Sequence, residues 1–200
     1  MTDPITQAVQ ILKNGGVVGF PTETVFGLAA DPTNPAAISA LFTLKGRPAS
    51  KPITLLIGRN ANPNDWVDWN PYAQTLSEYA WPGPLTIVCK LHAPVSPILT
   101  AGGDTLGLRM PAHPTALALL DAFGGPLAVP SANLSGEPAL TTATAVRSTF
   151  GDRLPLVLDG PPCEVGQAST VLSLVQRPTV LRAGTISKAT ISKVLGTVVQ

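Results

Sequence analysis

Three cations fall close together in a chain that otherwise carries little charge. Lys45, Arg47 and Lys51 lie within the segment KGRPASK, whereas only 12% of the residues are Asp, Glu, Lys or Arg. The proline fixes this loop and spreads the side chains, and a forked guanidinium beside ammonium groups suits a phosphate clamp. The same residues also suit a solvated helix end, where cations favour the helix dipole. The segment alone therefore leaves a phosphate site and a plain helix terminus both open.

Polar residues also follow apolar strands in three further segments. VVGF runs into PTETVFGL, and Arg109 ends the strand in LGLRMPAHP. PLAVPSANLSG carries a strand into Ser131 and Asn133, which are equally typical of turns and helix N-caps. Ligand sites in open α/β sheets gather in such loops, because backbone N–H groups and side chains converge at strand ends.

Several familiar catalytic motifs are absent from the sequence. No lysine follows a glycine and no two glycines are two positions apart, which excludes a P-loop and a dinucleotide fingerprint. No serine lies in a G-x-S-x-G elbow, and His92 and His113 are interpreted as structural. Cys89 and Cys163 form no metal-site spacing and are expected to be small buried hydrophobes. Since the net charge is only +1, any anionic partner must be held by a few local cations.

The elements that must position these residues alternate between helix and strand patterns. Asp-Pro, Asn-Pro and His-Pro pairs open four helices that glycine or proline closes, and two later segments are also helical. The expected helices run from Pro4 to Gly15, Pro35 to Gly46, Pro71 to Pro82 and Pro114 to Gly124, and over 142–150 and 188–195. The expected strands are 17–20, 53–57, 85–91, 105–109, 126–130, 155–158, 170–174 and 179–182. This mixture predicts an α/β fold with a mixed, twisted sheet.

Composition favours one globular domain over residues 1–200. Hydrophobic residues make up 44% of the chain, and no internal repeat or low-complexity tract interrupts it. The N-terminus has an acid at Asp3 and no continuous apolar region, so no signal peptide is expected. No apolar run approaches the roughly 18 residues that a membrane helix needs. We therefore expect a cytoplasmic protein.

Six short motifs occur in order along most of the chain. They are FPTETVFGL at 20–28, KGRP at 45–48, WPGPLT at 81–86, RMP at 109–111, PSANLSG at 130–136 and STV at 169–171. Over residues 15–184 the chain thereby resembles the YrdC-type L-threonylcarbamoyladenylate synthase family. Any one motif is weak, whereas six in order are specific. Some members have an additional C-terminal domain, and we expect the short form without it.

The resemblance implies a concave α/β domain and a defined reaction. L-Threonine and bicarbonate would form N-carboxy-threonine, whose carboxylate attacks the α-phosphate of ATP to give L-threonylcarbamoyl-AMP and pyrophosphate. A partner transferase would pass the threonylcarbamoyl group to an adenosine beside the anticodon of certain tRNAs, and weak tRNA binding by this chain is a further expectation. Magnesium would accompany ATP, held mainly by ATP oxygens and water. Such a reaction needs positioning and charge neutralisation more than a histidine base.

The resemblance also implies roles toward the nucleotide. Lys45 and Arg47 would be the catalytic residues and would bind the triphosphate. Ser131 and Asn133 would be neutral donors to phosphate or ribose, and Arg182 in LRAG would contact the nucleotide. Lys45 is expected to be an exposed loop lysine, so its replacement should reduce turnover while leaving the fold intact.

Four further residues are implied for binding threonine. Arg109 would receive the carboxylate, because its fork matches two oxygens. Thr22 would join it, although a threonine after Pro21 is equally typical of a turn. Ser169 and Thr170, in the STV motif, would complete the amino-acid site.

The sequence departs from the family pattern at three positions. Phe26 stands where tyrosine is usual, which removes a hydroxyl from the expected site wall. Ala168 replaces the glutamate that commonly precedes STV, and Ala183 replaces a common proline in LRPG.

Two other functions fit parts of the sequence. An RNA-binding module could use a concave face on tRNA or rRNA, but the near-zero net charge and the 5% aromatic content disfavour it. A carbamoyl-adenylate module like that of hydrogenase-maturation carbamoyltransferases is also disfavoured, because nothing here encodes their zinc-finger or acyl-phosphatase segments.

Overall fold

A polar residue followed by proline begins several helices in the computed structural model, which describes residues 3–200. The Asp3 carboxylate accepts the Thr6 N–H at 3.0 Å, and Asn34 and Asn70 cap the second and third helices in the same way. The helices are α1 (Pro4–Lys13), α2 (Pro35–Lys45), α3 (Pro71–Ala80), α4 (Pro97–Thr100), α5 (Pro114–Phe123), α6 (Ala143–Phe150) and α7 (Lys188–Leu195). The six predicted helices are confirmed, and α4 is an addition too short to show periodicity.

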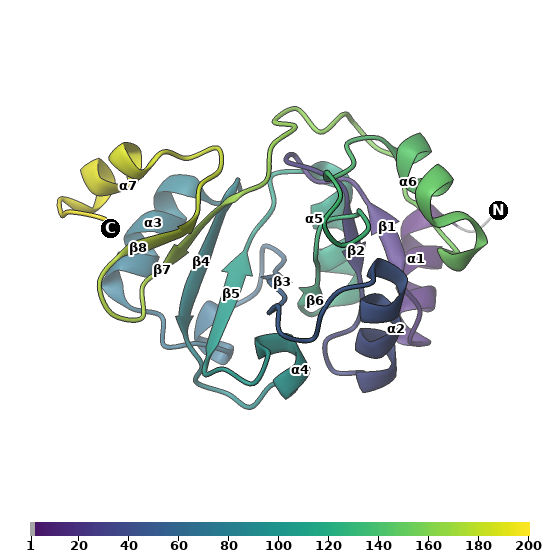
Figure 1. The fold of residues 1–200 in the computed structure, drawn as a ribbon, viewed down its shortest axis with the longest axis horizontal. Helices are drawn as coiled ribbons and strands as arrows, with labels where there is room; N and C mark the ends of the chain where they lie inside the picture. The colour runs from purple at the N-terminus through teal and green to yellow at the C-terminus, as the bar shows by residue number, and fades with distance from the viewer. Residues whose placement is uncertain (1–2) are drawn as a thin grey trace.

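A six-stranded mixed sheet occupies the centre of the fold, in the order β6-β3-β5-β4-β7-β8 (Figure 1). Its strands are β3 (Leu55–Leu56), β4 (Leu85–Lys90), β5 (Thr105–Arg109), β6 (Leu127–Ala128), β7 (Thr170–Ser173) and β8 (Thr179–Arg182). β3 is parallel to β5 and β4 is parallel to β7, whereas the other neighbours are antiparallel. A separate antiparallel pair, β1 (Val18–Phe20) and β2 (Gly27–Ala29), meets β6 through a bridge between Ala30 and Ala128. The predicted α/β class with a mixed sheet flanked by helices is confirmed.

One predicted strand is wrong, five are shorter than predicted, and β2 was not predicted. Residues 155–158 form only an isolated bridge between Val157 and Gly19. The Gly19 N–H donates to the Leu156 carbonyl at 2.9 Å, and the Leu158 N–H returns to the Gly19 carbonyl at 2.8 Å. The segment therefore pairs with β1 at one residue only. β3 and β6 are the most shortened strands, with two residues each, because the chain leaves the sheet at both ends of each of them.

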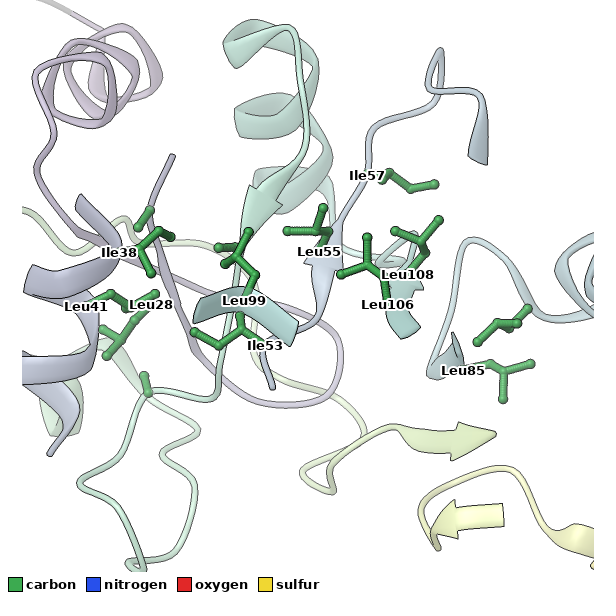
Figure 2. Close-up of a cluster of buried hydrophobic side chains, with 14 of the residues drawn as sticks. Leu28, Ile38, Leu41, Ile53, Leu55, Ile57, Leu85, Leu99, Leu106 and Leu108 are labelled. Atoms are coloured by element: carbon green, nitrogen blue, oxygen red, sulfur yellow. The ribbon is translucent and has the colours of Figure 1, made fainter. Parts of the chain in front are cut away.

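The two faces of the central strands have different environments. Leu85, Ile87 and Cys89 of β4 are buried in the hydrophobic core, as are Leu106 and Leu108 of β5. Figure 2 shows Leu85, Leu106 and Leu108 among the buried side chains of that core, which also includes Leu28, Ile38 and Leu41. Because side chains alternate along a strand, the residues between them face the other side of the sheet.

Apart from α4, which lies near β5, the helices gather at the two ends of the sheet. α3 and α7 lie beside β7 and β8, whereas α1, α2, α5 and α6 surround the β1–β2 pair at the opposite end (Figure 1). The middle of the sheet between these groups is where the loops with the six motifs meet. No helix between residues 3 and 200 is long and apolar enough to cross a membrane.

Candidate functional site

A cavity of about 580 Å³ lies over the face of the sheet that the core leaves free. Thr86 and Val88 of β4 line it, as do Thr105, Gly107 and Arg109 of β5. These are the positions that alternate with the buried core residues of the same strands. A Cβ built on Gly107 would lie 3.2 Å from a Thr86 methyl and 3.5 Å from Val88, so this glycine keeps the floor open.

Four cations line this cavity: Arg47, Lys51, Arg109 and Arg182, and no lining residue is acidic. Burial lowers the pKa of Arg47, and the nearby charge of Arg182 lowers it further. Burial likewise lowers the pKa of Arg182, with a smaller contribution from Arg109. The cations therefore repel one another in a partly desolvated space, which is suited to an anion with several charges.

The Arg109 guanidinium is held along one edge at the end of β5. Its Nε donates to the Gly83 carbonyl at 3.1 Å, which ties it to the WPGPLT loop. Its Nη2 donates to Glu23 Oε1 at 2.7 Å and to Thr24 Oγ1 at 2.9 Å. The Nε–Nη2 edge, which could bind a ligand carboxylate through two hydrogen bonds, is thus used by the protein. This leaves Nη1 as the group available to the cavity. Arg109 is 6% exposed, and burial lowers the pKa of its guanidinium whereas Glu23 opposes that shift.

Thr22 and Thr24 both line the cavity but have different roles. The Thr22 hydroxyl donates to the Val25 carbonyl at 2.6 Å and accepts the N–H groups of Thr24 and Val25, so it closes a local turn. Thr24 instead reaches Arg109. The turn interpretation of Thr22 therefore describes its backbone hydrogen bonds, and its hydroxyl also pairs with Thr24 Oγ1 at 2.8 Å. Thr24 is one of the cavity residues that the sequence analysis did not identify.

Lys45 lies elsewhere than the sequence predicts. It is the last residue of α2 and is only 3% exposed, so the prediction of an exposed loop lysine is wrong. Its ammonium donates to the carbonyls of Ser131 and Asn133, both at 2.7 Å, and to Asn133 Oδ1 at 2.9 Å. All three N–H groups are used on the PSANLSG loop, and Lys45 is not a lining residue. Burial first, and then the charges of Arg47 and Lys51, lower its pKa to about 8.

Ser131 and Asn133 divide between the cavity and its support. The buried Asn133 amide donates to the carbonyls of Leu134 and Glu137, both at 2.8 Å, while its oxygen accepts from Lys45 and from the Ser131 hydroxyl. Asn133 is therefore fully used in shaping the loop. Ser131 lines the cavity, and its position depends on Lys45 and Asn133. Its hydroxyl proton is used on Asn133, so in this arrangement it is not a free donor to a ligand.

The STV motif points one residue toward the cavity and the next away from it. Ser169 lines the cavity, where its hydroxyl pairs with Thr86 at 2.9 Å and accepts from Arg182 Nη2 at 3.1 Å. The Thr170 hydroxyl donates to the Ile186 carbonyl at 2.7 Å on the other side, and Thr170 is fully buried. The structure therefore brings Ser169 and Arg182 to the site, and does not bring Thr170. A Cβ on Gly184 would lie 2.4 Å from the Thr170 nitrogen, so only glycine permits this crossing of LRAG over STV.

Arg47 reaches the cavity from a loop that closes on itself. Its Nε and Nη2 donate to the carbonyls of Lys51 and Pro52, at 3.2 and 2.6 Å. The neighbouring Lys51 also lines the cavity. Two of the three departures from the family pattern, Phe26 and Ala168, are lining residues as well.

A family model described as "Telomere recombination", the Sua5/YciO/YrdC model, matches residues 10–184. The chain belongs to this family. All six motifs fall within the matched residues, so the Sua5/YciO/YrdC assignment covers the cavity and the loops that line it.

Two relatives of this chain carry the same activity in their names. The threonylcarbamoyl-AMP synthase of Bacillus subtilis is 43% identical over 97% of this chain, which covers 57% of that protein. A putative threonylcarbamoyl-AMP synthase of Mycobacterium leprae is 40% identical over 97% of this chain and 89% of its own length.

Solved structures of the same family have the same fold. Pyrococcus abyssi Sua5 complexed with L-threonine matches with a TM-score of 0.92 and 37% identity, over 98% of this chain and 58% of that one. E. coli YciO matches with a TM-score of 0.82 at 24% identity, which supports the fold alone. The chain thus spans somewhat more than half the length of the Bacillus and Pyrococcus relatives.

Proposed function

We propose that this Sua5/YciO/YrdC chain makes L-threonylcarbamoyl-AMP and pyrophosphate from L-threonine, bicarbonate and ATP, and so supplies the threonylcarbamoyl group for tRNA modification. The observation that carries the proposal is the cavity, which four cations and no acidic residue line. One of these cations is Arg109, a buried arginine held by hydrogen bonds to the protein. The names of the relatives and the threonine complex of Pyrococcus abyssi Sua5 support it.

The cations suit two anionic substrates in one cavity. Arg47, Lys51 and Arg182 would neutralise the triphosphate, with the Ser131 hydroxyl as a further contact. Arg109 would offer Nη1 to the threonine carboxylate, beside Thr24 and Ser169. This arrangement would bring the amino acid and the α-phosphate together, which is the main requirement of the reaction.

The proposed chemistry needs no protein base at the adenylyl-transfer step. A carbamate oxygen of N-carboxy-threonine forms a bond to the α-phosphorus, and the bond from that phosphorus to the bridging oxygen breaks as pyrophosphate leaves. The nucleophile is already an anion, so the residues act by orienting it and by offsetting the negative charge.

Magnesium would enter this site as a complex with ATP. Among residues 3–200 no three His, Cys, Asp or Glu side chains form a metal-binding group, and the cavity lining offers hydroxyls but no carboxylate. These residues fit an ion held by phosphate oxygens and water, as magnesium prefers. We further propose that the product passes to a partner transferase in the cytoplasm, where ATP, threonine and tRNA meet.

Pyrophosphate release tests the proposed function directly. With ATP and magnesium present, release should require both L-threonine and bicarbonate, and L-valine should not replace threonine. Absence of release with saturating substrates would contradict the proposal. In that case tRNA affinity should be measured against salt, because an RNA-binding module loses affinity steeply as salt rises.

The lowered pKa of Lys45 predicts a pH effect on ATP binding. The pKa of about 8 means that the ammonium is charged below this pH and neutral above it. A neutral amine has one donor too few for its three acceptors and no longer adds to the positive field of the cavity. The KM for ATP should therefore rise about tenfold, or about 1.4 kcal/mol, between about pH 7 and about pH 9.

A Lys45→Arg variant is the control for this pH effect. Arginine keeps its charge throughout the range, so the variant should show no rise in the KM for ATP above pH 8. A rise of equal size in the variant would assign the effect to another group.

Gly107→Val should strongly weaken ATP binding while leaving the protein folded. Valine favours strands, but its methyl groups would occupy the cavity floor beside Thr86 and Val88. We expect the affinity for ATP to fall at least about thirtyfold, roughly 2 kcal/mol, with the melting temperature nearly unchanged. Calorimetric titration and thermal unfolding measure the two quantities.

Gly125→Val is the matched control, since it makes the same exchange outside this cavity at a glycine whose added Cβ would meet nothing closer than 3.8 Å. It should bind ATP like the wild type. Wild-type affinity in Gly107→Val would show that neither substrate lies over the sheet floor.

A further inference from the structure

Glu23 is a buried acid that lies behind the cavity. It is 7% exposed and is not a lining residue. Its Oε1 accepts from Arg109 Nη2 at 2.7 Å, whereas its Oε2 is buried and has no hydrogen-bond partner within residues 3–200. One carboxylate oxygen is thus committed to Arg109, and the other has no identified task.

Glu23 is itself held in place by a second segment. The Val165 N–H donates to the Glu23 backbone carbonyl at 2.9 Å, so the loop before STV fixes the acid from outside. With the Gly83 carbonyl on Nε, Glu23 completes a clamp on one edge of the Arg109 guanidinium. A planar guanidinium held at that edge has its remaining nitrogen, Nη1, in a fixed direction.

We propose that Glu23 is a positioning residue that aims Arg109 Nη1 at the carboxylate of the amino-acid substrate. This inference rests on the proposed function. A purely structural ion pair would instead stabilise the fold without a selective effect on either substrate. The two roles differ in what a Glu23 variant does to the KM for threonine relative to the KM for ATP.

Two variants separate the position of Arg109 from the charge of Glu23. Glu23→Ala removes the shorter of the two hydrogen bonds of Nη2 and the paired charge. Thr24 and the Gly83 carbonyl then hold the guanidinium less firmly, so Nη1 can turn from its direction. Glu23→Gln keeps an oxygen at the place of Oε1 and puts its amide nitrogen at the place of the unpartnered Oε2. Because Oε2 makes no hydrogen bond, this exchange removes none.

The experiment measures pyrophosphate release against threonine and ATP, with direct threonine binding by equilibrium dialysis. In Glu23→Ala the KM and Kd for threonine should rise at least about tenfold, with the KM for ATP changed less than about twofold. Glu23→Gln should recover threonine affinity to within about threefold of the wild type. Thermal unfolding confirms that each variant is folded at the assay temperature.

Asp159→Ala is the matched control, because it breaks an arginine–carboxylate pair of the same 2.7 Å length on the exposed surface. It should leave both KM values unchanged. Equal increases in both KM values for Glu23→Ala, or a Gln variant as impaired as the Ala variant, would overturn the inference. Failure of the wild type to bind threonine would instead contradict the proposed function.

Discussion

Replacing Lys45 by methionine should both destabilise the protein and remove most of its activity. Methionine fills a similar volume but leaves the Ser131 and Asn133 carbonyls, which are now bonded to the ammonium, without a donor. Buried unsatisfied acceptors cost about 1–3 kcal/mol each, so the free energy of unfolding should fall by about 3 kcal/mol. With the PSANLSG loop loosened, kcat/KM for ATP should fall at least about a hundredfold, equivalent to about 2.7 kcal/mol.

Denaturant unfolding and pyrophosphate release would measure these two effects in the same protein preparation. Lys13→Met is the control, since Lys13 is exposed at the end of α1 and should tolerate the change. A Lys45→Met protein of normal stability but without activity would show that Lys45 acts on the substrate itself. Normal stability together with normal activity would contradict any role for it at this site.

Arg109→Met should weaken threonine binding far more than ATP binding. The substitution removes the Nη1 group proposed for the substrate carboxylate, and we expect the KM for threonine to rise about a hundredfold. The KM for ATP should change less than about threefold, because Arg47, Lys51 and Arg182 remain.

The same substitution should lower stability, since it leaves the Glu23 carboxylate buried without its partner. Breaking one side of a buried pair costs about 3–5 kcal/mol. Arg147→Met is the control, because Arg147 pairs with Asp159 on the exposed surface. Equal loss of affinity for threonine and ATP in Arg109→Met would show that the division between the two substrates is incorrect.

Local chemistry explains why the helices could be predicted from the sequence. Asp3, Asn34 and Asn70 each supply an oxygen to a free N–H in the first turn, and the following proline needs no such partner. These interactions span only a few residues, so the sequence alone contains them. The failed strand at 155–158 depends instead on β1, which is far away in the chain.

The motifs located the site, but the roles of several residues needed the fold. Ser169 directly precedes β7 and Thr170 begins it, so in this extended segment they face opposite sides of the sheet and do not share the cavity. The same alternation indicates Thr86 with Val88 and Thr105 with Gly107 as floor residues, a signal present in the sequence and not used. Lys45 could not be placed in this way, because its burial depends on a loop 86 residues further along the chain.

The gathering of cations explains why a net charge of +1 describes this protein poorly. The balancing acids lie elsewhere on the fold, so a bulk average conceals a strong local field. Like charges brought together oppose folding, and dissolved salt screens that opposition. The folded chain should therefore be more stable in solutions rich in anions. Multivalent anions should raise its melting temperature whether or not they resemble a substrate. Phosphate or sulfate buffers would accordingly suit purification and crystallisation of this protein.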